Sequence, residues 1–207
     1  MRTPLRGVAL LSLVALTMAS PAFSQSAPSP GVGWSGSARC QLSVQGPGYS
    51  DSETHTWTIT GPATVEGAFR VYPATWSVTG SGSLQRTQGS QTLAAQWTIN
   101  APAMSAPIAI FVRASDGRMF MQPRHAQVRA RDAVQGQQQV TIEGKPQTPV
   151  KISAEAFEWT FPVVEVPAGS TTLSGSSTPA VNGSVGLMQP GGSRATASCS
   201  WQYSQAR

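Results

Sequence analysis

The residue types that most often carry catalysis are sparse in this chain and form no catalytic pattern. The two histidines, His55 and His125, have no partner at the spacing of a metal site, and the nine acidic residues are scattered. The sequence contains neither the H-E-x-x-H motif nor the G-x-S-x-G motif. Paired carboxylates for glycoside hydrolysis would have to be brought together by folding. We therefore expect no enzymatic activity, no cofactor and no metal.

A basic stretch, Arg113–Arg131, is the best candidate for ligand contact. It holds five arginines against one acid, Asp116, and the guanidinium fork suits paired oxygens of phosphates or carboxylates. It could bind an anionic glycan or an anionic envelope polymer. The plainer interpretation, which we favour, is a charged edge strand that blocks edge-to-edge pairing. The candidate contact residues are Arg118, Arg124, His125, Arg129 and Arg131.

Tryptophan recurs in similar short stretches, "HTWTITG", "ATWSVTG", "AQWTINA" and "FEWTFPV". Residues two apart on a strand point the same way, so Trp57 shares a face with Ile59 and not with the neighbouring threonines. Core packing is therefore favoured over a ligand platform or a true repeat, because the spacing between the stretches is uneven. The threonine face is expected to be solvated, with a flat ligand-binding array as the less favoured alternative. The predicted core tryptophans are Trp57, Trp76, Trp97 and Trp159.

The chain has two cysteines, Cys40 and Cys199. In an exported protein such a pair usually forms a disulfide, which here would join the first strand to the last. Two free thiols or an intermolecular bridge are the alternatives.

The N-terminal residues have the pattern of a secretory signal peptide. Arg2 and Arg6 precede a short apolar run, and "AFS" offers a small-residue cleavage site, so we assign residues 1–24 to the signal. We expect residues 25–33 to form a flexible Ser/Pro/Gly tether and residues 34–207 to form a single domain. No later run is long enough for a transmembrane helix. The expected location is periplasmic or extracellular, where the modest net charge of +5 predicts no nucleic-acid partner.

Apolar and polar residues alternate along most of the chain, which is the signal of half-buried β-strands. The clearest hairpin joins Ile108–Ala114 to Arg118–Gln122, with Asp116-Gly117 as a two-residue turn of positive φ. Short connections throughout predict roughly ten to twelve mostly antiparallel strands. We expect a single-domain, all-β sandwich, with a closed or partly open β-barrel as the alternative.

These features favour an exported, non-catalytic binding protein of the bacterial cell envelope. Its ligand would be a glycan, an anionic envelope polymer or another envelope protein. A structural or assembly protein that acts through sheet-edge pairing is the alternative. A hydrolase whose site is assembled only by the fold ranks third.

Overall fold

The computed structural model describes residues 33–113, 115–124, 128–157, 162–181 and 191–205, which belong to one compact unit, Val32–Arg207. The secondary-structure elements in these residues are all β-strands, so the predicted all-β class is confirmed. The fourteen strands are β1 (Trp34–Gly46), β2 (Tyr49–Ile59), β3 (Thr64–Glu66), β4 (Phe69–Tyr72), β5 (Ala74–Gln88), β6 (Gln91–Ser105), β7 (Ile108–Val112), β8 (Met119–Pro123), β9 (Arg129–Ile142), β10 (Lys145–Pro146), β11 (Val150–Phe157), β12 (Val164–Val166), β13 (Thr172–Ser177) and β14 (Arg194–Gln205).

The predicted number of strands, ten to twelve, was too low. Three of the strands, β3, β10 and β12, are only two or three residues long. Such short segments carry no readable alternation, because two or three residues do not establish a period.

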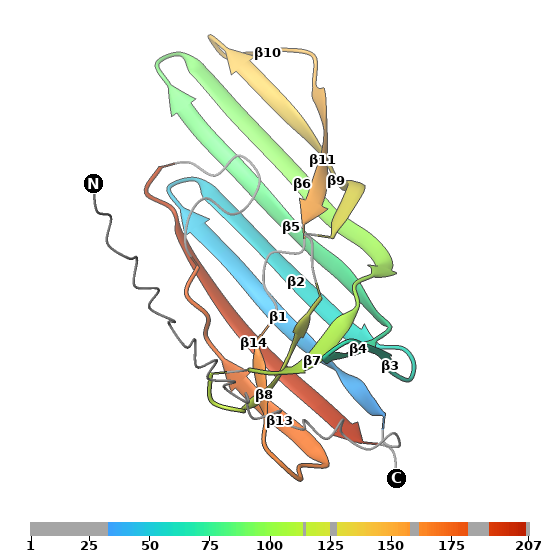
Figure 1. The fold of residues 1–207 in the computed structure, drawn as a ribbon. Coiled ribbons are helices and arrows are strands. Elements are labelled where there is room, and N and C mark those ends of the chain that lie inside the picture. The colour runs from blue at the N-terminus through green and yellow to red at the C-terminus, as the bar shows by residue number, and fades with distance from the viewer. Residues whose placement is uncertain (1–32, 114, 125–127, 158–161, 182–190, 206–207) are drawn as a thin grey trace, which may run out of the picture. The chain divides into compact units, whose positions relative to one another are not determined.

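Nine strands form a large antiparallel sheet, in which eight follow the order β10-β9-β6-β5-β2-β1-β14-β13 and the ninth, β11, pairs with β9 off this path. Both β10 and β11 pair with β9, one after the other along the side that faces away from β6. Strands β1 and β14 come from opposite ends of the described chain and lie side by side in the sheet (Figure 1). The first and last described strands are thus interior strands of the sheet, with β13 between β14 and the edge.

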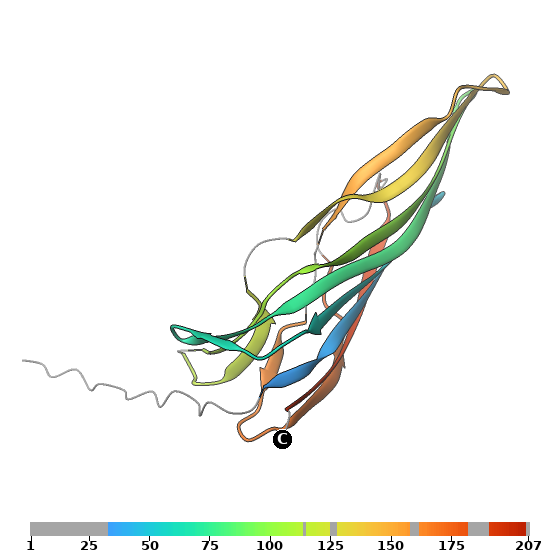
Figure 2. The ribbon, with the colours of Figure 1, turned by 90° about the vertical axis from the view of Figure 1, so that its right-hand side faces the viewer.

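The other five strands form a small antiparallel sheet in the order β12-β8-β7-β4-β3. The small sheet lies over one end of the large sheet, and β5, β6, β9 and β11 continue beyond it (Figures 1 and 2). A single buried cluster contains Trp57 and Trp76 from the large sheet and Ile108 and Met121 from the small one. This packing is consistent with a β-sandwich. The sheets do not close into a barrel, so the barrel alternative was wrong.

Three of the four predicted core tryptophans belong to this cluster. Trp57 and Trp76 face each other across β2 and β5, and both are fully buried. Trp97 on β6 is only 3% exposed. Trp159 lies outside the described residues.

Cys40 on β1 and Cys199 on β14 form a disulfide, as predicted. The two residues are direct partners in the β1–β14 register, with Cα atoms 4.0 Å apart. The bond therefore joins two neighbouring interior strands through cysteines that are 159 positions apart in the sequence.

The hairpin predicted around Asp116 is present as β7 and β8, but its turn differs from the prediction. Arg113 N–H donates to the carbonyl of Arg118, and Gly117 N–H donates to the carbonyl of Arg113. Only Gly117 of the predicted turn pair has a positive φ, of 70°. The loop is therefore longer than a two-residue turn, in which both residues would need a positive φ.

Candidate functional site

Polar side chains cross the outer face of the large sheet, the face turned away from the core, in two neighbouring rows. Side chains alternate along a strand, so the residues on either side of buried Asp51 and Trp97 point outward. The strand register aligns them across β1, β2, β5, β6 and β9. The first row is Gln45, Ser50, Ser83, Gln96 and Gln137, and the second is Ser52, Ser81, Thr98 and Gln135.

These rows line a groove of about 620 Å³, which we call the polar groove. Its floor is the backbone of Asp51, Gly82, Trp97 and Gly136, which form the row between the two polar ones. Neighbouring strands are about 4.8 Å apart, so the groove extends roughly 14 Å from β2 to β9. A second hollow of about 430 Å³ shares part of the same lining and continues the groove toward the β5–β6 turn.

The polar groove is lined by hydroxyl and carboxamide groups. Such groups both donate and accept hydrogen bonds without bringing a charge. The one acid in its lining, Asp51, is 1% exposed, and its side chain belongs to the core face of β2. The indole of Trp97 likewise lies on the core face. The groove is thus suited to an uncharged ligand with many hydroxyl groups, bound by hydrogen bonds rather than by ring stacking.

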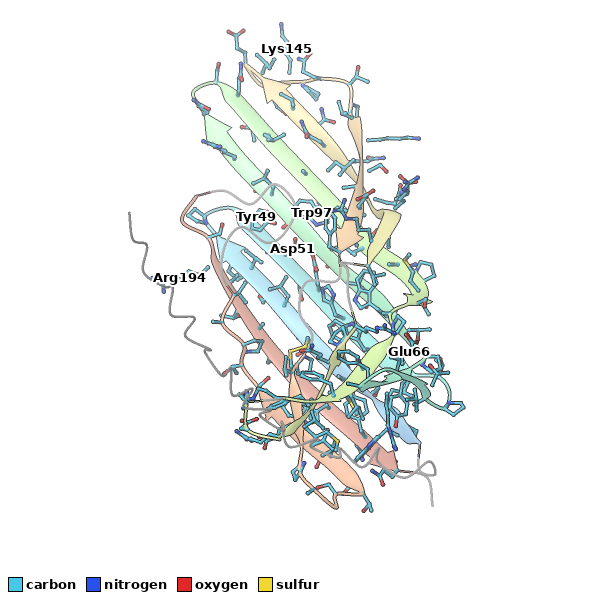
Figure 3. The ribbon with its side chains drawn as sticks, in the orientation of Figure 1. Tyr49, Asp51, Glu66, Trp97, Lys145 and Arg194 are labelled. Carbon is cyan, nitrogen blue, oxygen red and sulfur yellow. A yellow bond between two sulfur atoms is a disulfide. The ribbon has the colours of Figure 1, made fainter. Side chains whose placement is uncertain are left out.

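Glycine at position 82 allows the tight packing beneath the groove. Gly82 is the direct partner of Trp97, and an added Cβ would lie 2.3 Å from Cε2 and Cζ2 of the indole. The indole therefore covers the glycine on the core face, and the Trp97 ring centroid is 5.8 Å from that of Tyr49. Tyr49, Asp51 and Trp97 lie close together in Figure 3.

Replacing Gly82 by alanine is expected to lower the free energy of unfolding by about 1–3 kcal/mol, the usual cost of overpacking a core. Urea unfolding of the purified protein measures the change. Gly191→Ala is the matched control, because an added Cβ there meets no atom within 4 Å. Equal stability of the two variants would show that the indole does not pack on the glycine.

The core face of β2 carries a column of polar side chains that the sequence analysis did not single out. Tyr49, Asp51, Glu53 and His55 lie at every second position of this strand, on the same face as Trp57. Tyr49 Oη donates to Asp51 Oδ2 over 3.2 Å. Burial, reinforced by the charge of Asp51, raises the pKa of the Tyr49 hydroxyl well above its usual value.

His55 links this column to the tryptophan core. Trp76 Nε1 lies 3.1 Å from His55 Nδ1, and an indole nitrogen can only donate, so Nδ1 accepts. The ring proton is then on Nε2, which donates to Glu53 Oε2 over 2.8 Å. His55 is fully buried, and the Glu53 side chain is 14% exposed. Since the imidazole is closed off from solvent, we assign this network a structural role.

The predicted contact residues on the basic stretch are paired with acids from distant parts of the chain. Arg118 is ion-paired with Glu165, and Arg124 with Glu66. Glu155 Oε2 lies 3.9 Å from Arg129 Nη1. Glu155 Oε1 lies 4.0 Å from Arg131 Nε. His125 lies outside the described residues.

The charges at the tip of the β7–β8 hairpin are paired in the same way. Arg113 is ion-paired with Asp116, and this hydrogen bond lowers the pKa of Asp116 to about 2. The positive charge of the basic stretch is therefore largely balanced. We therefore take the polar groove, whose lining residues come from five strands, as the candidate site.

The buried column could have been found from the sequence. In "YSDSETHTW" the residues Tyr, Asp, Glu, His and Trp occupy alternate positions, which places them on one strand face. The sequence could not show that Trp76 on β5 is the partner of His55, because the register of the sheet brings the two residues together.

Comparison with protein-family models, with curated proteins and with solved structures gave no match to this chain. Among the described residues, no helix is long and apolar enough to cross a membrane. In the same residues, no three His, Cys, Asp or Glu side chains gather as a metal site would require. The fold and the groove therefore define the class as an all-β protein of two antiparallel sheets with a polar surface groove.

Proposed function

We propose that the chain is an exported, non-catalytic binding protein of the cell envelope, and that its ligand is an uncharged glycan held in the polar groove. The observation that carries this proposal is the lining, in which two aligned rows of serine, threonine and glutamine cross the sheet, and the one acid between them, Asp51, is buried with its side chain on the core face. Ligand sites orient their ligands through a few placed polar groups. The disulfide supports export, since such bonds persist in oxidising compartments.

An uncharged glycan is favoured over the anionic polymer that the basic stretch suggested. An anion would need free guanidinium or ammonium groups. Arg118, Arg124, Arg129 and Arg131 each have a carboxylate within ion-pair distance. Displacing these carboxylates would offset part of the gain from a bound anion.

Binding to uncharged hexasaccharides, such as cellohexaose, maltohexaose and chitohexaose, tests the proposal by isothermal titration calorimetry. We expect at least one of them to bind with an affinity that is unchanged between about 0.05 and 0.5 M salt, because no ion pair is formed. Replacing Gln96 and Gln137 together by alanine is expected to weaken binding by about 30-fold, from two hydrogen bonds of about 1 kcal/mol each.

The matched control is Gln41→Ala with Gln202→Ala, which removes two exposed glutamines of the same sheet outside the groove. It should bind like the wild-type protein. A sulfated hexasaccharide that binds in a salt-sensitive way, and is lost in Arg129→Ala with Arg131→Ala, would contradict the proposal in favour of an anionic ligand. Oligomers without any glycan binding would favour the structural alternative, for which β13 is the edge strand without a charged residue.

A further inference from the structure

The polar groove runs across the strands of the large sheet, and this direction bears on which glycan it can hold. Strands β2, β5, β6 and β9 are consecutive in the sheet (Figure 1), and each gives one side chain to each polar row. The lining therefore repeats once per strand, with a period of about 4.8 Å along the groove. Beyond β2, strand β1 adds only Gln45, which belongs to the first row.

The distance between the two rows sets the width of the groove. On each strand the side chains of the two rows are two residues apart, which is roughly 7 Å. The residue between them turns its side chain to the core, so the floor between the rows is backbone. At Gly82 and Gly136 the floor has no side chain on either face. The groove is thus wide enough for one sugar chain lying flat, with the edges of its rings turned toward the two rows.

Neighbouring groups of the lining are in contact from strand to strand. Ser50 Oγ on β2 and Ser83 Oγ on β5 lie 3.0 Å apart. Thr98 Oγ1 on β6 donates to the carbonyl of Gln135 on β9 over 3.4 Å. A hydroxyl donates one hydrogen bond and accepts two, so these groups are held in place and can still bond a ligand. A ligand gains most from such a lining when it presents a hydroxyl group to every strand.

We infer that the groove selects an extended β-1,4-linked glycan, which lies across the strands with one sugar ring over each strand. The inference rests on the proposed function, because it takes the ligand to be a glycan. The rings of a fully extended β-1,4 chain follow one another at nearly the strand spacing of about 4.8 Å. Both edges of this flat chain carry a hydroxyl group at every ring. Serine, threonine and glutamine donate and accept, so they can bond either kind of edge.

Two other arrangements fit the groove less well. The rings of an α-1,4-linked chain turn progressively into a wide helix, so only one or two consecutive rings can lie against straight rows of this length. A β-1,4 chain that lay along one strand would meet side chains of the same face only every 7 Å or so, which is longer than one ring. In both arrangements the rings and the side chains lose their register after one or two rings.

Cellohexaose and maltohexaose are a matched pair of probes, because they contain the same glucose units and differ only in the configuration of their linkages. We expect calorimetry to show that cellohexaose or chitohexaose binds about 25-fold more tightly than maltohexaose. The coiled chain loses contact with two of the four strands, and one net hydrogen bond per strand is worth about fivefold in affinity.

Maltohexaose that binds within about fivefold of the better β-linked chain would overturn the inference and leave the proposed function standing. If none of the three hexasaccharides binds, the proposed function itself is contradicted, and the inference is contradicted with it.

The length of the β-1,4 chain gives a second measurement. We expect the affinity to rise about fivefold with each ring from two rings to four, one for each of the four strands, and to change little from four rings to six. Gln137→Ala, at an exposed position of β9, should weaken the tetrasaccharide and the hexasaccharide about fivefold. It should affect the trisaccharide far less, since three rings still fit over β2, β5 and β6.

The control for this series is Gln41→Ala with Gln202→Ala, at exposed positions outside the groove, which should leave the affinity at every length unchanged. An affinity that does not rise beyond two rings would contradict a chain lying across the strands. The same conclusion would follow if Gln137→Ala weakened all lengths equally.

Discussion

Replacing Cys40 and Cys199 together by alanine is expected to lower the free energy of unfolding by about 3–5 kcal/mol, because the bond closes a very long loop in the unfolded chain. The two cysteines are 159 positions apart, and both are buried between β1 and β14. Beyond β1, the remaining partner of β14 in the large sheet is β13. Loss of the bond therefore leaves β14 joined to β1 by the hydrogen bonds and packing of the β1–β14 ladder, without a covalent cross-link between the two strands.

Urea unfolding with and without a reducing agent measures this effect. Reduction should destabilise the wild-type protein by a similar amount and leave the double alanine variant unchanged. A loss smaller than about 1 kcal/mol would contradict the expectation, and would mean that the unfolded chain gains little freedom when the bond is removed.

Replacing His55 by leucine is expected to cost about 2–5 kcal/mol, because it removes the partner of two hydrogen bonds and an unsatisfied buried group costs about 1–3 kcal/mol. The change leaves Trp76 Nε1 without its acceptor and Glu53 Oε2 without the imidazole donor. Leucine is similar in volume and apolar, so the loss reports on the polar network rather than on packing.

Trp76→Phe separates the two hydrogen bonds, because it removes the indole donor and keeps an aromatic ring at this site. Its expected cost, about 1–3 kcal/mol, is that of losing the indole donor to His55 Nδ1. Thr58→Leu is the control, since Thr58 is exposed on the opposite face of β2. If His55→Leu is as stable as the wild-type protein, the network contributes nothing to folding.

Alternation along the chain was sufficient to predict the longer strands and the faces of their tryptophans. It separated Trp57 and Trp76 from the threonines beside them, and the structure buries both tryptophans. It could not divide the strands between two sheets, because the pairing of β4 with β7 depends on contacts between segments far apart in the sequence. The disulfide was predictable because only two cysteines were available.

The sites were harder to predict than the strands. The basic stretch looked like the strongest binding feature because its partners, Glu66 and Glu165, lie 58 and 47 positions from the arginines they meet. The polar groove has no local signature, since Ser50, Ser83 and Gln96 resemble any solvated strand residues. Only the register of β2, β5 and β6 aligns them into a row.

The most direct test of the polar groove is a ¹H–¹⁵N NMR titration of the protein with the hexasaccharide that binds best in calorimetry. We predict that shift changes concentrate on the backbone amides around Ser83 and on the side-chain amides of Gln96 and Gln137. The amides of the small sheet and of Arg129–Arg131 should not move. Shifts confined to those two regions, or no shift with any uncharged hexasaccharide, would contradict the account.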